Sequence, residues 1–358
     1  MKVSLFETAN DLRTILPEWE DLALHAGEHN CFYEPWMVLP ALEDLPQSKS
    51  PIFLVISDRD IETGKEQFLG FFPVIRSWRY SGLYMAHFRM WRYAHCLFCN
   101  PLVRRGHEIE VVGCFLNWWK GAQESPSLFL FNEVERDSVF LQELRSQVAH
   151  SEILSYEESH PRAIVERATS FQEYEQKTFS LSFQEELRKK RRELEALGEF
   201  QFRSVRALSL DDADVQQFLR LEQLNFKGPE LSEFLKRIIE QGNVQVSSLW
   251  CSERCVAASI HLMSDGTGFS FKSVFDFEFK KCSPSLLLEV EYIRFLHEQE
   301  TVFVVDTCRE SSNEIHYHPE NNVRRITDFS IACRNFPEGF AVSYVVPVIQ
   351  GLKSRTSH

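Results

Sequence analysis

The chain has 358 residues, of which 44% are hydrophobic and 25% charged, and its formal net charge is −13. This length exceeds what one hydrophobic core usually organises, so the sequence predicts two domains or one large one. The acidic balance argues against general binding to DNA or to anionic membranes, because a surface that contacts phosphates normally needs a basic excess.

The apolar runs and the cysteines indicate in which cellular compartment the protein lies and whether it binds a metal. No apolar run approaches the roughly 20 residues of a membrane-spanning helix, and the opening MKVSLFETANDLR lacks the apolar core of a signal peptide. Nine scattered cysteines, an odd number, fit a reducing compartment. Cys96 and Cys99 form a C-x-x-C after His95, but no second ligand pair follows at zinc-finger spacing. We therefore expect a cytoplasmic protein without a membrane span or a metal.

The first half alternates helical and strand-like segments. Apolar residues at three-to-four spacing predict a helix over 8–26, broken early by Pro17. A hairpin is predicted next, because two strand-like runs flank a polar, Gly-containing loop. The further predictions are helices at 36–42, 107–120 and 137–148, and strands at 52–57, 68–75, within 81–102, and at 128–133.

A regular helix is predicted over 182–198, after a segment, 152–168, that loses apolar periodicity and is interpreted as linker. Ser182 and Glu185 form a capping-box pattern, and Gly198 supplies a stop. Five basic residues lie at 188–192. They form either a solvated face or a surface on which Arg188, Arg191 and Arg192 point at an anionic substrate or a cofactor phosphate.

The stretch 269–309 reads strand, basic loop, helix, strand. Ser283 is an N-cap candidate and Pro284 suits the first helical position, with Lys280 and Lys281 just before them. Helix N–H groups beside two lysines make a seat for a phosphate-bearing ligand, whereas the alternative is a capped core helix with solvated lysines. The second half then has the order β-α-α-β-β-β-α-β, with a late strand near 341–346. The first half repeats nearly the same order, which suggests duplication.

Several short motifs resemble one protein family. They are PEWEDLA, FLGFFPVI followed by NPLV, LRKKRRELEALG, LNFKGPE, FKSVFDFEFKKCSPSLLLEVE, and VDTCRESSNEI with VRRI. Together they resemble the GNAT-superfamily acyltransferases, in the branch named for CelD-type cellulose-biosynthesis proteins, which is related to the Fem aminoacyl transferases.

This resemblance implies an α/β (α+β) fold of tandem GNAT-like domains, each a mixed, mostly antiparallel sheet flanked by helices. The domains are expected at 1–158 and 181–358, joined over 159–180 by a linker and a helix. The second domain would hold acyl-CoA, with the pyrophosphate at the positions of the family's glycine-rich loop: Lys280, Lys281, Ser283, Ser285 and Leu286. Both glycines of that loop are replaced here, and Pro284 removes one N–H donor.

Direct transfer to an amine requires a base and a donor for the developing oxyanion. Glu289 lies near the apolar edge of the predicted helix, and Asp306 ends an apolar strand, so both are candidate bases. Either carboxylate could instead cap a helix or pair with Arg324 or Arg325. The family pattern further suggests that Lys227 and Asp276 orient substrate, although both also suit exposed turns.

Three functions are compatible with these residues. The first is an N-acyltransferase that moves an acyl group from acyl-CoA to an amino group of a small molecule or saccharide precursor. The second is a Fem-like transfer from aminoacyl-tRNA, with residues 188–192 contacting the acceptor stem. The third is a non-catalytic binding protein on a degenerate GNAT fold, suggested by the missing glycines.

Overall fold

The chain folds into two compact units, one containing Met1–His160 and Arg325–His358, the other Pro161–Arg324. The computed structural model describes residues 1–47, 49–59, 64–121, 126–225, 230–241, 243–299, 302–310 and 323–333. The first boundary falls inside a strand, close to the predicted domain end at 158. The chain from Arg325 on, which the sequence assigned to the second domain, clusters with the first unit.

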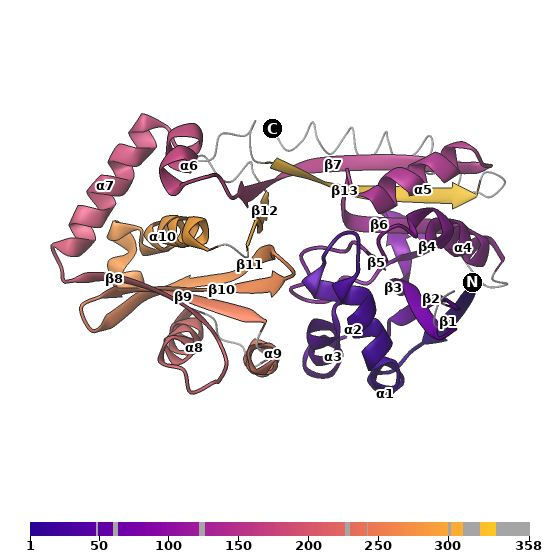
Figure 1. Cartoon of the computed structure of the whole chain (residues 1–358), viewed down its shortest axis with the longest axis horizontal. Coiled ribbons are helices and arrows are strands. Elements are labelled where there is room, and N and C mark those ends of the chain that lie inside the picture. The colour runs from indigo at the N-terminus through magenta and orange to yellow at the C-terminus, as the bar shows by residue number, and fades with distance from the viewer. Residues whose placement is uncertain are drawn as a thin grey trace. The chain divides into compact units, whose positions relative to one another are not determined.

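The first unit is a mixed sheet flanked by helices (Figure 1). Its strands are β1 (Lys2–Phe6), β2 (Ile52–Arg59), β3 (Glu66–Tyr80), β4 (Leu83–Met90), β5 (Leu102–Val103), β6 (Leu128–Glu135), and parts of β7 (Ile153–Glu166) and β13 (Val323–Cys333). Its helices are α1 (Ala9–Arg13), α2 (Leu16–Leu24), η1 (Cys31–Tyr33), α3 (Pro35–Asp44), α4 (Glu108–Gly121) and α5 (Val139–Ala149). The strand order is β1-β2-β3-β4-β6-β13-β7, with β5 on β3. The pair β4–β6 is parallel, and β1–β2, β2–β3, β3–β4 and β6–β13 are antiparallel.

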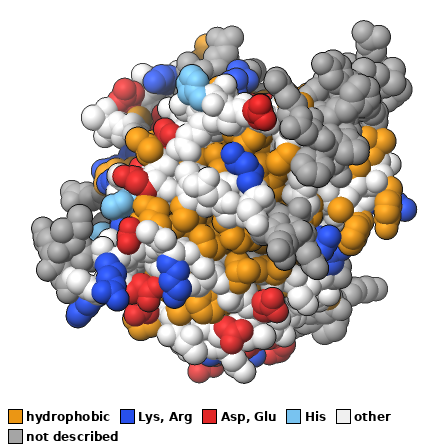
Figure 2. Space-filling view, turned by 90° about the vertical axis from the view of Figure 1, so that its right-hand side faces the viewer, with side chains coloured by type: hydrophobic (Ala, Val, Ile, Leu, Met, Phe, Trp, Pro, Cys, Tyr) orange, Lys and Arg blue, Asp and Glu red, His pale blue; other side chains and the backbone are white. Residues whose placement is uncertain are grey.

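Aromatic side chains fill the core of this unit. Trp19 of α2 stacks on Phe71 at 4.4 Å between ring centroids, and Phe72 stacks on Phe115 of α4 at 5.1 Å. Both Phe71 and Phe72 are fully buried on neighbouring positions of β3, so they point to opposite faces of the sheet. Phenylalanine therefore packs helices on both faces, which accounts for its high frequency in the sequence. On the face drawn in Figure 2, apolar side chains gather near the centre with charged side chains of both signs around them.

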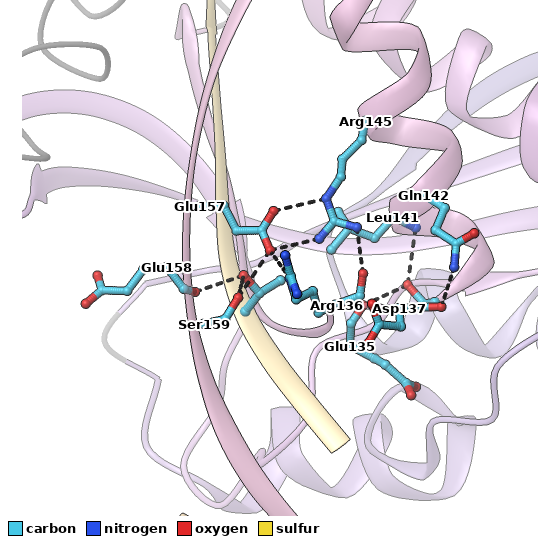
Figure 3. Close-up of polar contacts among 11 residues, drawn as sticks. Glu135, Arg136, Asp137, Leu141, Gln142, Arg145, Glu157, Glu158 and Ser159 are labelled. Atoms are coloured by element: carbon cyan, nitrogen blue, oxygen red, sulfur yellow. Dashed lines mark hydrogen bonds and ion pairs between the residues drawn. The ribbon is translucent and has the colours of Figure 1, made fainter. Parts of the chain in front are cut away.

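A polar network joins β7 to the rest of the first unit (Figure 3). The Glu157 carboxylate accepts hydrogen bonds from Arg136 Nε at 2.8 Å and from Arg145 Nε at 3.0 Å and Nη2 at 2.9 Å. Arg145 also lies over the Phe329 ring of β13, 5.7 Å from its centroid. One carboxylate on β7 thus connects α5, the turn before it and, through Arg145, strand β13.

The second unit repeats this element order. It contains α6 (Phe171–Thr178), α7 (Leu181–Glu195), β8 (Phe200–Arg206), α8 (Ala213–Asn225), α9 (Glu230–Glu240), β9 (Val244–Cys251), β10 (Arg254–Ser264), β11 (Thr267–Phe275), η2 (Phe277–Cys282), α10 (Pro284–Glu298) and β12 (Val304–Glu310). The strand order is β7-β12-β11-β10-β9-β8. Helix α10 covers one face of β9–β11 and α8 the other (Figure 1). In both units an antiparallel meander leads through a helix to a parallel strand, so the predicted fold class is confirmed.

Two local predictions were wrong. The linker interpreted over 152–168 is strand β7. Its residues from 153 to 160 are mostly exposed or half-buried, so the strand has no regular apolar alternation to reveal it. Ser180, rather than Ser182, caps α7 and accepts a hydrogen bond from the Phe183 N–H at 3.2 Å. The helix predicted over 8–26 with a break at Pro17 is present as α1 and α2, with Pro17 in the first turn of α2. The strand expected near 341–346 lies outside the described residues.

Candidate active site

The candidate site begins where β11 and β12 diverge. These parallel strands pair through Thr267↔Val304, Gly268↔Val305 and Phe269↔Asp306, and β11 continues to Phe275 beyond that point. Gly268 permits the close approach, since a Cβ there would lie 3.0 Å from Val305 Cγ2. The register of β11 on β10 also shifts here, from Ile260↔Lys272 to His261↔Ser270, which makes Phe271 the extra residue of a β-bulge.

Asp306 is a buried carboxylate between two arginines at this divergence. Its side chain is 0% exposed, and its Oδ2 lies 3.1 Å from Arg324 and 3.7 Å from Arg162. Its Oδ1 accepts the N–H of Cys308 at 2.7 Å. Cys308 has a positive φ of 57°, so this hydrogen bond supports a strained turn of the strand. The predicted pairing of Asp306 with Arg324 is present, and both oxygens have protein partners.

Glu289 of α10 is more accessible than Asp306. Its side chain is 25% exposed, and its Oε2 accepts from Arg309 at 3.4 Å. Arg309 lies three residues after Asp306 on β12, so this contact connects Glu289 to the strand that carries Asp306. Glu291 of the same helix accepts a hydrogen bond from Arg191 of α7 at 2.9 Å.

A buried polar pair lies under α10 next to these carboxylates. Tyr292 of α10 stacks on His261 of β10, with ring centroids 3.6 Å apart and an interplanar angle of 13°. Ser259 Oγ lies 2.9 Å from His261 Nε2, and Ser270 Oγ lies 3.4 Å from Nδ1. Burial, reinforced by Arg309, lowers the pKa of His261 to about 3, so the ring is neutral at physiological pH.

At the expected phosphate site, helix α10 begins at Pro284 as predicted, but the Ser283 side chain does not cap it. Ser283 ends η2 and precedes α10 with φ 49° and ψ 55°, a left-handed conformation that favours glycine. Its side chain makes no capping hydrogen bond, and its carbonyl accepts from the N–H groups of Leu286 and Leu287. Lys280 and Lys281 are exposed on η2. Serine therefore occupies a left-handed position that usually favours glycine.

Helix α7 packs against this segment. Lys190 Nζ donates to the carbonyl of Lys281 at 2.6 Å, and a groove of about 570 Å³ lies between α7 and η2. Its lining residues are Lys190, Glu193, Leu197, Glu278, Lys281 and Cys282. The structure thus brings the basic helix and the basic loop together around a groove that two lysines and two glutamates line.

The remaining predicted residues have visible structural contacts. Arg191 pairs with Glu195 and Glu291 and lies 4.2 Å from the Phe200 ring centroid, whereas Arg188 and Arg192 are exposed.

Asp276 is buried, accepts the Glu278 N–H at 3.1 Å and binds Arg254 at 2.6 Å, so it caps η2. Lys227 lies outside the described residues.

Sequence reasoning missed Arg162, His261 and Tyr292. Arg162 lay in the segment interpreted as linker, and a histidine within an apolar strand gives no local signal of function. Within the described ranges, no three His, Cys, Asp or Glu side chains are grouped to hold a metal. No helix described for this chain is long and apolar enough to cross a bilayer.

Comparisons with known proteins agree with the geometry of the second unit. Residues 182–316 match the family described as acetyltransferase (GNAT) domain. No curated protein matches the chain significantly.

Three solved structures share the fold at low identity. The C-terminal domain of a putative lysylphosphatidylglycerol synthetase from Agrobacterium fabrum has a TM-score of 0.55 and 13% identity, covering 94% of this chain and 96% of that one. L-PGS from Bacillus licheniformis has a TM-score of 0.52 and 13% identity, covering 93% and 96%. FemX has a TM-score of 0.50 and 9% identity, covering 86% and 88%. The match over residues 182–316 confirms the resemblance of this part of the chain to the GNAT superfamily, and the chain shares its fold with FemX.

Proposed function

We propose that the second unit is an N-acyltransferase that uses an acyl-CoA thioester and acylates an amino group of a small molecule or saccharide precursor. The observation that carries this proposal is the divergence of β11 and β12 with Glu289 and Asp306 beside it, all inside the segment that matches the GNAT domain. A gap between parallel strands exposes backbone groups to which an extended chain such as pantetheine can bind.

Donor binding is assigned to the start of α10. The helix dipole and the exposed Lys280 and Lys281 favour a pyrophosphate there, and the left-handed Ser283 keeps the loop tight. Ser285 supplies its N–H and its hydroxyl as donors in the first turn, whereas the N–H of Leu286 already donates to the Ser283 carbonyl, so Leu286 contributes to the site through its backbone position. Arg188 and Arg192, exposed on α7, remain candidates for an anionic part of either substrate.

Catalysis is assigned to Glu289 rather than Asp306. The acceptor amine must lose a proton as its nitrogen attacks the thioester carbon, and Glu289 is the accessible carboxylate beside the strand gap. Asp306 is fully buried with both oxygens engaged, so its proposed role is to hold Arg162 and Arg324 at the site. Lys227 and Asp276 remain proposed substrate-orienting residues, Asp276 acting through η2.

Calorimetry with acetyl-CoA and with longer acyl-CoA thioesters tests the proposal. We expect saturable binding that weakens at least tenfold in a Lys280→Ala/Lys281→Ala variant. The matched control is Lys236→Ala, which removes a lysine of α9 that pairs with Glu233 on the same helix. Absence of heat with every thioester would leave the proposal without support.

One alternative has its own supporting observation. FemX and two lysylphosphatidylglycerol synthetase structures share the fold, and the sequence resemblance includes Fem aminoacyl transferases. In this alternative, the donor is aminoacyl-tRNA and the exposed basic face of α7 contacts the acceptor stem. Binding of charged tRNA with a steep salt dependence, abolished by Arg188→Ala/Arg192→Ala, would favour it.

A further inference from the structure

Arg89 of β4 is a half-buried arginine without an anionic partner among the described residues. Its Nε is shielded from solvent and has no hydrogen-bond acceptor. The two terminal nitrogens of the guanidinium also lack an acceptor, but they remain accessible to solvent. A buried nitrogen of a charged group is costly when it is unpaired, because water no longer replaces the missing hydrogen bond. The first unit therefore presents an accessible guanidinium to an anion from outside the protein.

A second cation lies on the same face of the sheet. Arg89 and His87 are two residues apart on β4, so their side chains project from one face, about 7 Å apart along the strand. Ser77 of β3 is the residue paired with His87, and its hydroxyl lies 3.4 Å from Nζ of Lys49, which precedes β2. This spacing lets the Arg89 guanidinium and the Lys49 ammonium contact one small polyatomic ion.

Both positive charges act on the buried ring of His87. The residue is 1% exposed, and its Nδ1 lies 3.0 Å from the Met85 carbonyl oxygen. Burial lowers the pKa of His87, and the charges of Arg89 and Lys49 lower it further, so the ring is neutral at physiological pH. Because each cation is near enough to affect the same ring, the two create a local excess of positive charge in a chain whose net charge is −13.

The arrangement of these donors selects the charge and the shape of the ligand. Two cations that have no carboxylate partner among the described residues match a dianion, whereas a single carboxylate would neutralise only one of them. The oxygens of a phosphate group point in several directions, so one oxygen can accept from the planar Arg89 guanidinium and another from the Lys49 ammonium. The Ser77 hydroxyl adds a third donor.

We propose that Arg89, Lys49 and Ser77 form a binding site in the first unit for a phosphate group, carried either by free phosphate or by a phosphate monoester. The site lies outside the segment 182–316 that matches the GNAT domain, so it does not depend on the proposed acyl transfer. Free phosphate and a monoester present the same oxygens to these three side chains, and the experiment must therefore separate the two sources.

Calorimetry of the full chain with inorganic phosphate, glucose 6-phosphate and acetate, at constant ionic strength, tests the site. We expect saturable binding of phosphate or its monoester and no binding of acetate. Affinity should fall at least about tenfold in Arg89→Met and in Lys49→Met, the loss expected when one charge-assisted hydrogen bond is removed. Tighter binding of glucose 6-phosphate than of phosphate would identify a monoester ligand, and the reverse order would identify free phosphate.

Arg13→Met is the matched control. Arg13 is an arginine of the same unit whose side chain is 45% exposed and lies 2.5 Å from the Glu43 carboxylate, so its loss should leave phosphate affinity unchanged. Lys280→Ala/Lys281→Ala, which alters the donor site proposed in the second unit, should also leave it unchanged. Without ligand, the Tm of Arg89→Met should equal or exceed that of the wild type, because the substitution removes the buried nitrogen that lacks an acceptor.

Three results would overturn the inference. The first is a wild type that binds neither phosphate nor glucose 6-phosphate. The second is a phosphate affinity that survives both Arg89→Met and Lys49→Met, since binding would then occur elsewhere on the chain. The third is binding of acetate as tight as that of phosphate, because the site would then not require a dianion.

Discussion

Removing the charge of Asp306 should destabilise the second unit strongly. Asp306→Asn keeps the shape of the side chain and an acceptor for the Cys308 N–H, but it leaves Arg162 and Arg324 facing a neutral amide. The side chains of the two arginines are 6% and 13% exposed, so water replaces little of the lost attraction. Breaking a buried ion pair typically costs about 3–5 kcal/mol. We expect a loss of about 3 kcal/mol, at the lower end of this range, because the Arg162 contact of 3.7 Å is longer than a hydrogen bond.

Urea unfolding followed by circular dichroism measures this loss. With an m-value of about 2 kcal/mol/M, the transition midpoint of the second unit should fall by roughly 1.5 M. Glu278→Gln is the matched control, since Glu278 is 72% exposed in an ion pair with Arg254, and such pairs contribute about 0–1 kcal/mol. If the transition midpoint of Asp306→Asn equalled that of the control, the claim that the buried ion pairs of Asp306 stabilise the second unit would be refuted. Below its transition, Asp306→Asn should keep most of its kcat if the carboxylate only positions the arginines.

Three further changes test other parts of the structure. Partial burial alone would raise the pKa of Glu157, but hydrogen bonds from Arg145 and Arg136 outweigh burial, and the net pKa is lowered. The ionised Glu157 therefore stabilises the fold above the ordinary carboxylate pKa of about 4.3, and this stabilisation is lost as the pH falls through the lowered pKa. Glu157→Gln should therefore cost about 1 kcal/mol at pH 7 and nothing at the acid end of a pH series of unfolding curves. Glu289→Gln should lower kcat by about 10²-fold or more with acetyl-CoA affinity retained, and normal turnover by this variant would exclude Glu289 as base. Ser283→Gly should raise the free energy of unfolding by up to about 1 kcal/mol, because glycine relieves the left-handed strain but loses more entropy on folding, whereas a clear destabilisation would argue against the φ of 49°.

Local signals identified the elements that depend on nearby residues. Pro284 and the preceding serine located the start of α10, and the covered strand β12 followed from its short apolar run. The same signals supported the meander in each unit. These elements can be predicted without knowing their distant contacts, because their capping residues and apolar periodicity lie within a few residues of one another.

Features set by distant contacts escaped sequence reasoning. Strand β7 is stabilised by its pairing with β12 and by the contact of Glu157 with α5. Because these partners are distant in sequence, the strand forms without an apolar pattern of its own, and its polar residues gave no strand prediction. His261 and Tyr292 belong to different elements, and their stacking depends on how α10 packs on β10. Asp306 was identified, but its two arginine partners come from β7 and β13, which only the tertiary structure brings together.

Native mass spectrometry of the full chain with acetyl-CoA tests the central claim most directly. We predict one bound CoA thioester per chain, with occupancy reduced in Lys280→Ala/Lys281→Ala and retained in Lys236→Ala. Charged tRNA added in equal amount should not displace the thioester. A chain that acquires no mass from any acyl-CoA, yet forms a complex with charged tRNA, would contradict the account.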